Sequence, residues 1–112
     1  MENMPEFNLH RPETAAEAVK LKASDATSRY LAGGTDMIVN VRRGIEEPET
    51  MIDLTAIVAI TEISAEGGGL RIGAGVKLAD LAAHADLKRD YPAIAEAAAS
   101  VAGPTHRQYG TI

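Results

Sequence analysis

The six residues Leu31-Ala32-Gly33-Gly34-Thr35-Asp36 decide the fold of this chain. They follow an apolar run at residues 29–32 that is typical of a short strand, and they precede residues 36–43, whose pattern predicts a helix. Thr35 is placed to cap the start of that helix, and Gly44 is placed to end it. A strand that turns through two glycines into a helix is typical of a parallel α/β unit.

The segments on either side complete such a unit. Residues 6–9 alternate in polarity and predict a strand, and residues 49–54 predict another strand after the second helix. Thr14 and Glu17 have the spacing of a capping box, which predicts a helix that ends at about Lys22. The residues expected on the buried side of this helix are Ala15, Ala18, Val19 and the stem of Lys22. Residues 1–54 are therefore expected to form a βαβαβ lobe with a small three-stranded parallel sheet.

After residue 54 the pattern changes. Residues 55–60 predict a helical turn, which leads into a strand near residues 62–65. The glycines at residues 67–69 predict a hairpin turn, because glycine enters positive φ without strain, and residues 70–74 predict the antiparallel partner strand. The glycines expected in a bulge or turn at the end of that strand are Gly73 and Gly75.

Two helices are expected next. The first places Leu78, Leu81, Ala82 and Ala85 on one face. The second begins at Tyr91-Pro92, with Pro92 in its first position, and ends at Gly103-Pro104. The residues expected to face inward from it are Ile94, Ala97, Ala98 and Val101. The predicted fold class is therefore α/β in the α+β sense, with residues 55–112 as the first part of a second, antiparallel lobe that is incomplete at the C-terminus.

Composition restricts the class of protein. The 112 residues include 11 Lys and Arg against 16 Asp and Glu, a formal net charge of −5, so nucleic acids and anionic membranes are poor partners. No apolar run reaches the ~18 residues that span a bilayer, and the N-terminal residues lack the apolar core of a signal peptide. The absence of cysteine excludes disulfides, thiolate metal sites and thiol nucleophiles from this chain. A cytoplasmic protein is expected.

The loop at residues 31–36 is also the strongest candidate site. It lies between a parallel strand and a helix, where α/β proteins receive phosphate. Its two glycines allow an anion to approach the backbone, consecutive N–H groups can form an anion-binding concavity, and Thr35 adds a hydroxyl donor. The alternative is a tight strand-to-helix turn in which Thr35 is an ordinary cap. The loop is no Walker motif, because no Lys follows the glycines, and the spacing G-x-G-x-x-G is absent.

The remaining polar residues give weaker signals. The three histidines are far apart and have no i,i+4 partner, which argues against a metal site, and His84 is expected on the surface late in a helix. The aspartates are not spaced as a catalytic carboxylate pair. Those expected on solvated faces are Asp53, Asp80 and Asp86.

Several segments, taken in order along the whole chain, resemble one family. These segments are Tyr30-Leu31-Ala32-Gly33-Gly34-Thr35-Asp36, Val41-Arg42-Arg43-Gly44, Ile52-Asp53-Leu54, Leu70-Arg71-Ile72-Gly73-Ala74-Gly75-Val76 and Gly110-Thr111-Ile112. They are similar to the FAD-binding subunit or domain of molybdopterin dehydrogenases, a PCMH-type fold found in xanthine dehydrogenase and in the medium subunit of carbon monoxide dehydrogenase. The last segment resembles the start of the family's second flavin motif, Gly-Thr-Ile-Gly-Gly-Asn, so a truncated chain is expected.

The resemblance implies FAD as the cofactor. In the family, two glycine-rich loops hold the FAD pyrophosphate, mostly through backbone N–H groups. The cofactor-binding residues implied here are Leu31, Ala32, Gly33, Gly34, Thr35 and Asp36 in the first loop and Thr111 in the second. No catalytic residue and no metal ligand are implied in this chain. Molybdopterin and iron–sulfur clusters are implied elsewhere, on a molybdopterin-binding large subunit and an iron–sulfur small subunit, so a hetero-oligomer is expected.

Within the family, residues 100–107 most resemble the β subunits of 4-hydroxybenzoyl-CoA reductases. Most relatives carry Ile-Arg-Asn near the place where His106-Arg107-Gln108 stands here. The resemblance implies an electron-transfer part of a flavin-dependent oxidoreductase, inactive alone, that serves reductive dehydroxylation to benzoyl-CoA in anaerobic aromatic degradation. The alternative, from a different class, is a structural or interaction module whose glycine turns bind no cofactor.

Overall fold

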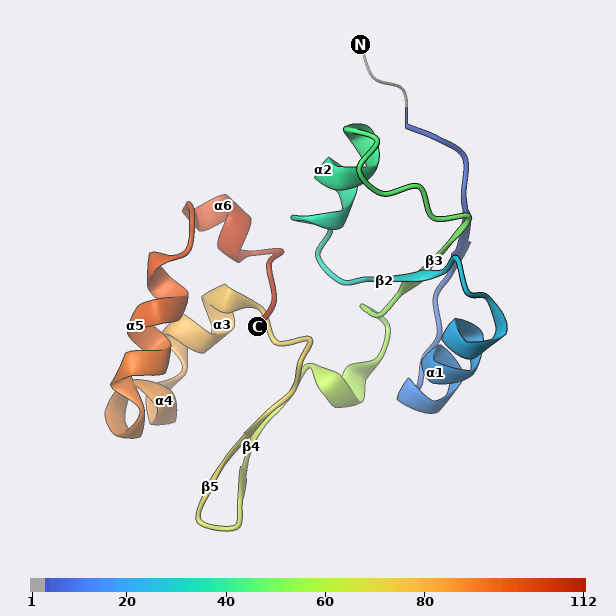
Figure 1. Cartoon of the computed structure of the whole chain (residues 1–112). Coiled ribbons are helices and arrows are strands. Elements are labelled where there is room, and N and C mark those ends of the chain that lie inside the picture. The colour runs from blue at the N-terminus through green and yellow to red at the C-terminus, as the bar shows by residue number, and fades with distance from the viewer. Residues whose placement is uncertain (1–3) are drawn as a thin grey trace. The chain divides into compact units, whose positions relative to one another are not determined.

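Three parallel strands organise the first half of the chain (Figure 1). The computed structural model describes residues 4–112, and the chain divides into two units, Met1–Ala59 and Ile60–Ile112, each of which is described by itself. The first three residues of the expected lobe at residues 1–54 lie outside the described residues. The lobe boundary after residue 54 stays a prediction.

The first unit has the predicted βαβαβ order. Its elements are β1 (Asn8–His10), α1 (Ala15–Ser24), β2 (Arg29–Leu31), α2 (Met37–Arg42) and β3 (Thr50–Asp53). The strand order is β1-β3-β2, and both pairs are parallel, with Leu9 opposite Met51 and Tyr30 opposite Ile52. The predicted three-stranded parallel sheet is therefore confirmed, although β1 begins two residues later than expected, where its pairing with β3 begins.

The central strand β3 is the most deeply buried part of this sheet. Met51 and Ile52 are both completely buried, although successive side chains of a strand point to opposite faces. Burial on both faces is typical of a parallel strand that helices cover on each side. Figure 1 shows α1 and α2 on either side of the β2–β3 pair. The buried helix residues are Ala18 of α1 and Val41 of α2.

Helix α1 begins as the capping box predicts, because the Thr14 Oγ1 accepts a hydrogen bond from the Glu17 N–H at 3.2 Å. Its buried side is narrower than expected. Ala18 is buried, but Ala15 is exposed and Val19 is 61% exposed. The prediction for these two residues is wrong, because a sheet of three short strands covers only a narrow stripe of the helix.

Helix α2 begins one residue later than expected, and Thr35 does not cap it. The N-terminal cap is Asp36, which lies in a right-handed helical conformation. The helical turn starts at Gly34, whose carbonyl accepts a hydrogen bond from the Ile38 N–H at 3.2 Å. The cap position falls on Asp36, one residue after Thr35, so the capping role predicted for Thr35 is wrong.

The end of α2 confirms the role predicted for Gly44. The Gly44 N–H donates to the Val41 carbonyl at 3.2 Å, and the Ile45 N–H donates to the Asn40 carbonyl at 2.9 Å. These are the two hydrogen bonds of a Schellman motif, which needs a left-handed residue after the helix. Gly44 supplies it with a φ of +73°.

The second unit contains the predicted hairpin. A short 3-10 turn, η1 (Val58–Ile60), precedes the antiparallel strands β4 (Ile63–Glu66) and β5 (Gly69–Ile72). Gly67 and Gly68 have φ values of +58° and +82°, so they form a two-residue turn of type I′. The third glycine, Gly69, pairs with Glu66 as the first residue of β5. The hairpin is confirmed, with two of its three glycines in the turn.

Gly73 follows β5 where two backbone segments lie very close together. The Gly73 N–H donates to the Glu62 carbonyl at 2.9 Å, and the Gly75 N–H donates to the Ile60 carbonyl at 2.8 Å. A Cβ on Gly73 would overlap the Ile60 carbonyl group. The turn after β5 therefore requires glycine for its lack of a side chain.

Four helices complete the second unit: α3 (Leu78–Ala83), α4 (Ala85–Asp90), α5 (Pro92–Ser100) and α6 (Pro104–Arg107). The single helix expected to continue through Ala85 is wrong, because His84 interrupts it with a ψ of 122°. The break allows both Leu81 and Leu87 to be buried. In a continuous helix, residues six positions apart point in very different directions.

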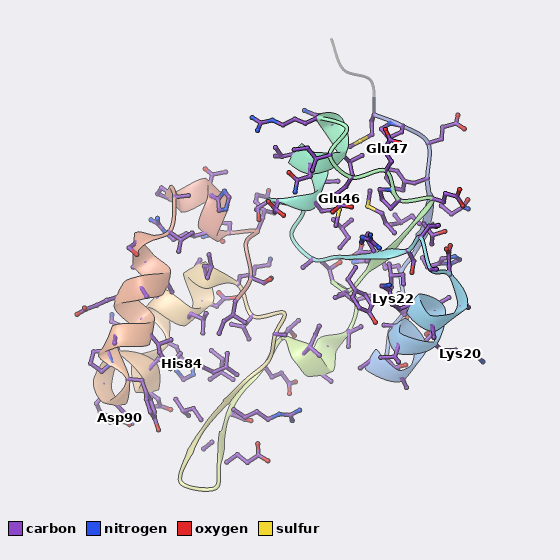
Figure 2. The ribbon with its side chains drawn as sticks, viewed as in Figure 1. Lys20, Lys22, Glu46, Glu47, His84 and Asp90 are labelled. Carbon is purple, nitrogen blue, oxygen red and sulfur yellow. The ribbon has the colours of Figure 1, made fainter. Side chains whose placement is uncertain are left out.

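His84 is a helix cap rather than a surface residue of a continuous helix. Its Nδ1 accepts a hydrogen bond from the Leu87 N–H at 3.4 Å, and its side chain is half-buried. Figure 2 shows His84 beside the helices of the second unit, with Asp90 at the end of α4. The surface position expected for His84 is therefore wrong.

The core of the second unit is small. It consists of Val76, Leu81, Leu87, Ala95 and Ala98, and Leu78 and Ala82 pack against it as predicted. The residues predicted to face inward from α5 divide into two groups. Ala98 is buried, but Ala97 is exposed and both Ile94 and Val101 are 39% exposed.

The prediction of the inward face of α5 is wrong by part of a turn, because the alanines of the helix pack into the core. Ala95, which was not expected inside, is buried beside Ala98. The larger Ile94 and Val101 instead line an open apolar groove of about 430 Å³, together with Leu78 of α3.

Candidate cofactor-binding loop

The loop at residues 31–36 leaves β2 at the carboxyl edge of the parallel sheet. The Leu31 carbonyl accepts a hydrogen bond from the Leu54 N–H at 2.9 Å, which ties the start of the loop to the end of β3. The half-buried residues of the loop are Leu31, Ala32, Gly33, Gly34 and Thr35, and Asp36 is exposed. In open α/β sheets, ligands bind at the carboxyl ends of the strands.

The backbone N–H groups of this loop have no protein acceptor. Within residues 4–112, none of the six consecutive N–H groups of residues 32–37 donates a hydrogen bond to another residue. Gly34 has a φ of +78°, and a left-handed residue within a loop can turn successive N–H groups toward one anion. N–H groups at the start of a helix have no acceptor within the helix, so this row is open to bind oxygens of a phosphate group.

The Asp36 carboxylate is bonded along α2 and does not cap the helix. Its Oδ2 accepts a hydrogen bond from the Asn40 Nδ2 at 3.1 Å. An aspartate at a helix N-cap usually accepts a hydrogen bond from the second or third N–H of the helix, but Asp36 makes no such bond. Asn40 is absent from the site predicted by sequence, although the i,i+4 spacing of Asp36 and Asn40 is a signal that could have identified it.

Asp53 at the end of β3 is fully engaged within the first unit. Its Oδ1 accepts hydrogen bonds from the Thr55 N–H at 2.9 Å and from the Thr55 Oγ1 at 2.7 Å. Its Oδ2 lies 3.4 Å from the Arg11 Nε, and the side chain is 18% exposed. The solvated position expected for Asp53 is therefore wrong, because the residue closes a turn and joins the ends of β1 and β3.

Thr111, the remaining predicted cofactor contact, lies in the second unit. It forms an isolated antiparallel bridge with Lys77 and is half-buried. The Leu78 N–H donates to the Gly110 carbonyl at 2.9 Å, and the Ile112 N–H donates to the Val76 carbonyl at 3.1 Å. This short segment is thus held in an extended conformation, as predicted for the end of the chain.

Several other titratable residues have structural partners. The Asp86 Oδ1 lies 3.1 Å from the Arg89 Nη2, and the Asp90 Oδ2 lies 2.9 Å from the same nitrogen. The hydrogen bond from Arg89 lowers the pKa of Asp90, and a hydrogen bond from the Thr27 side chain lowers the pKa of Asp25. Among residues 4–112, no three His, Cys, Asp or Glu side chains are grouped to hold a metal ion. No helix in this range is long and apolar enough to cross a bilayer.

The fold is that of an FAD-binding domain. Residues 5–112 match the family described as the FAD binding domain in molybdopterin dehydrogenase. The chain belongs to this family, and its cofactor is FAD. The resemblance read from the sequence motifs is confirmed at this level.

Two relatives show how much of a family member the chain represents. The xanthine dehydrogenase FAD-binding subunit of Escherichia coli O157:H7 is 33% identical over 105 residues, which are 93% of this chain and 36% of that protein. The carbon monoxide dehydrogenase medium chain of Hydrogenophaga pseudoflava is 33% identical over 109 residues, which are 96% of this chain and 38% of that protein. The chain thus spans little more than a third of the length of these relatives.

A solved structure supports the fold directly. In the carbon monoxide dehydrogenase from Hydrogenophaga pseudoflava that lacks the Mo-pyranopterin moiety of its molybdenum cofactor, one chain superposes with a TM-score of 0.94 at 32% sequence identity. The match covers 97% of this chain and 38% of that chain. The mixed fold, with a parallel three-stranded sheet followed by an antiparallel sheet, is therefore that of the family.

Proposed function

We propose that residues 31–36 bind the diphosphate of FAD, chiefly through backbone N–H groups. The observation that carries the proposal is the row of N–H groups at residues 32–37 without a protein acceptor, with Gly34 in a left-handed conformation among them. Hydrogen bonds to a charged oxygen are stronger than those between neutral groups, so a row of amides binds a diphosphate without a Lys or Arg. Thr111 is proposed as a further FAD contact.

The residues of this chain hold and orient the cofactor. FAD, when bound, supplies the electron-transfer chemistry. We propose that the chain is part of the FAD-binding electron-transfer subunit of a molybdenum-containing dehydrogenase in the cytoplasm. The partners proposed are a molybdopterin-binding large subunit and an iron–sulfur small subunit. The names of the relatives, a xanthine dehydrogenase FAD-binding subunit and a carbon monoxide dehydrogenase medium chain, support this proposal.

The finer proposal, that the complex is a 4-hydroxybenzoyl-CoA reductase, is supported by the sequence of residues 100–107. Arg107 has a structural role in this segment, because its Nη1 donates to the Val101 and Ala102 carbonyls, each at 2.9 Å. The test is a substrate assay of the native complex with a low-potential electron donor. Conversion of 4-hydroxybenzoyl-CoA to benzoyl-CoA is expected. Turnover of xanthine or carbon monoxide in its place would overturn the finer proposal and leave the flavin proposal intact.

The flavin proposal is tested by titrating the ¹⁵N-labelled chain with FAD, ADP and riboflavin. FAD and ADP carry a diphosphate, whereas riboflavin carries no phosphate. We expect FAD and ADP to shift the amide resonances of residues 32–37, and we expect riboflavin to leave them unchanged. FAD binding that shifts only other amides would remove this loop from the site. Failure of the chain to bind FAD at millimolar concentration would favour a structural module whose glycine turns bind no cofactor.

A further inference from the structure

Helix α6 buries none of its side chains. It is four residues long and directly precedes the last residues of the chain. In residues 4–112, Arg107 is the only residue of α6 whose side chain donates a hydrogen bond to another part of the chain: its Nη1 donates to the Val101 carbonyl and to the Ala102 carbonyl, each at 2.9 Å. Because burial does not orient α6, these two hydrogen bonds from a charged donor hold it against the end of α5.

The turn that Arg107 closes has an unfavourable backbone conformation. Ala102 has a φ of +47°, and in the part of the chain that the structure describes no other residue except glycine has a positive φ. Such a conformation is unfavourable for a residue with a Cβ, and it persists where neighbouring groups hold it. The two carbonyls that Arg107 binds lie on either side of the Ala102 Cα, so the guanidinium holds this turn between α5 and α6.

The other end of α6 leads to Gly110 and Thr111 (Figure 1). The His106 carbonyl accepts hydrogen bonds from the Tyr109 N–H at 3.1 Å and from the Gly110 N–H at 2.9 Å, and the Gly110 carbonyl accepts one from the Leu78 N–H at 2.9 Å. A Cβ on Gly110, which is buried, would lie 3.4 Å from the His106 carbonyl oxygen. The position of Gly110, and with it the position of Thr111, is therefore set by α6 on one side and by the start of α3 on the other.

Thr111 keeps its own backbone N–H open. In its antiparallel bridge with Lys77, the two hydrogen bonds are made by the residues before and after Thr111, so its N–H points away from Lys77. In residues 4–112, the Thr111 N–H donates to no other residue. A shift of α6 would move this donor.

We propose that Arg107 is a positioning residue for the cofactor: by tying α6 to the end of α5, it holds Thr111 where its N–H and hydroxyl can contact the diphosphate of FAD. The inference rests on the proposal that Thr111 contacts FAD, and it adds a residue outside the predicted site. Arg107 acts through α6 and does not contact the ligand.

The test compares Arg107→Met with the unchanged, ¹⁵N-labelled chain in a titration with FAD. Methionine keeps most of the length of the side chain and removes its donors. We expect the Kd for FAD to rise about three- to tenfold, less than the loss of a whole hydrogen bond to a charged group would cause. The FAD-induced shift of the Thr111 amide should shrink, while the shifts of residues 32–37 remain at saturation.

Two further variants identify the cause. Arg107→Lys keeps a charged donor, so it should restore the Kd to within about twofold of that of the unchanged chain. Thr105→Ala is the matched control, because Thr105 is exposed on α6 and its side chain makes no hydrogen bond in the described part of the chain. It should leave the Kd unchanged.

The outcomes separate this inference from the function it rests on. If FAD shifts residues 32–37 but not Thr111 in the unchanged chain, both the Thr111 contact and the role of Arg107 are overturned, and the loop proposal stands. If Thr111 shifts and Arg107→Met binds FAD equally well, only the role of Arg107 is overturned. The same holds if Arg107→Lys binds as weakly as Arg107→Met, or if the weaker binding comes with loss of the native amide signals of Leu81 and Leu87, which would show a role in folding alone.

Discussion

A Cβ placed on Gly34 would lie 3.0 Å from the Ile38 Cγ1. The same two residues are joined by the first hydrogen bond of α2, from the Ile38 N–H to the Gly34 carbonyl at 3.2 Å. Gly34 also has a φ of +78°. Position 34 therefore favours glycine for reasons within the protein, and a test of its role in ligand binding must separate these reasons from the ligand.

Gly34→Val should weaken FAD binding more than tenfold while the chain still folds. A β-branched side chain crowds Ile38 and disfavours the left-handed conformation, at a cost of about 1–2 kcal/mol for the backbone alone, so the row of N–H groups is displaced. Gly44→Val is the matched control, because Gly44 has a similar φ of +73° with nothing within 4 Å of its Cβ position. The measurements are the Kd for FAD and the circular dichroism spectrum. Full FAD binding by Gly34→Val would remove the loop from the site.

Gly73→Ala should destabilise the second unit. The added Cβ overlaps the Ile60 carbonyl, and overpacking of this kind costs about 1–3 kcal/mol. Gly69→Ala is the control, since its Cβ meets its nearest neighbour, the Tyr91 hydroxyl, at an ordinary 3.6 Å. Urea unfolding followed by the signals of residues 60–112 measures both variants. Equal stability of the two would show that the chain at Ile60 moves aside without cost.

Asp25 should contribute to stability in a pH-dependent way. The Thr27 Oγ1 donates to the Asp25 Oδ1 at 2.7 Å, and this hydrogen bond is the main cause of a pKa below the usual 3.8. A lowered folded-state pKa stabilises the fold above the unfolded value, and the contribution is lost as the pH falls through the folded value. Thr27→Val should raise the pKa of Asp25 toward 3.8, and Thr27→Ser should keep it low. A ¹³C titration of the Asp25 carboxyl carbon measures this, and an unchanged pKa in Thr27→Val would contradict it.

The 112-residue chain should bind FAD with a Kd weaker than about 1 µM. The motif that Gly110-Thr111-Ile112 resembles continues with two glycines and an asparagine that are not among these residues. Each charge-assisted hydrogen bond is worth about 1.5–3 kcal/mol, so the absence of two weakens binding by several hundredfold or more. Isothermal titration calorimetry with FAD gives the Kd. Submicromolar binding by a monomer would show that the loop at residues 31–36 is sufficient.

Features that depend on a few neighbouring residues were predicted correctly from the sequence. Thr14 caps α1, Gly44 ends α2, and Gly67 and Gly68 turn the hairpin, because each involves hydrogen bonds or φ angles within one turn of the chain. The position of the loop at residues 31–36 between a strand and a helix could be read for the same reason, since its two adjacent glycines are visible in the sequence, and its role in cofactor binding stays a prediction. The family could also be read from the order of its motifs, which the match over residues 5–112 confirms.

Tertiary packing decided the features that depend on distant residues. Val19 is exposed because the sheet covers only a narrow stripe of α1, and His84 breaks a helix so that Leu81 and Leu87 can share one core. Gly73 is required by the Ile60 carbonyl, thirteen positions earlier in the chain. Local sequence does not show which backbone segment lies against a given residue, so these features became visible only in the folded chain.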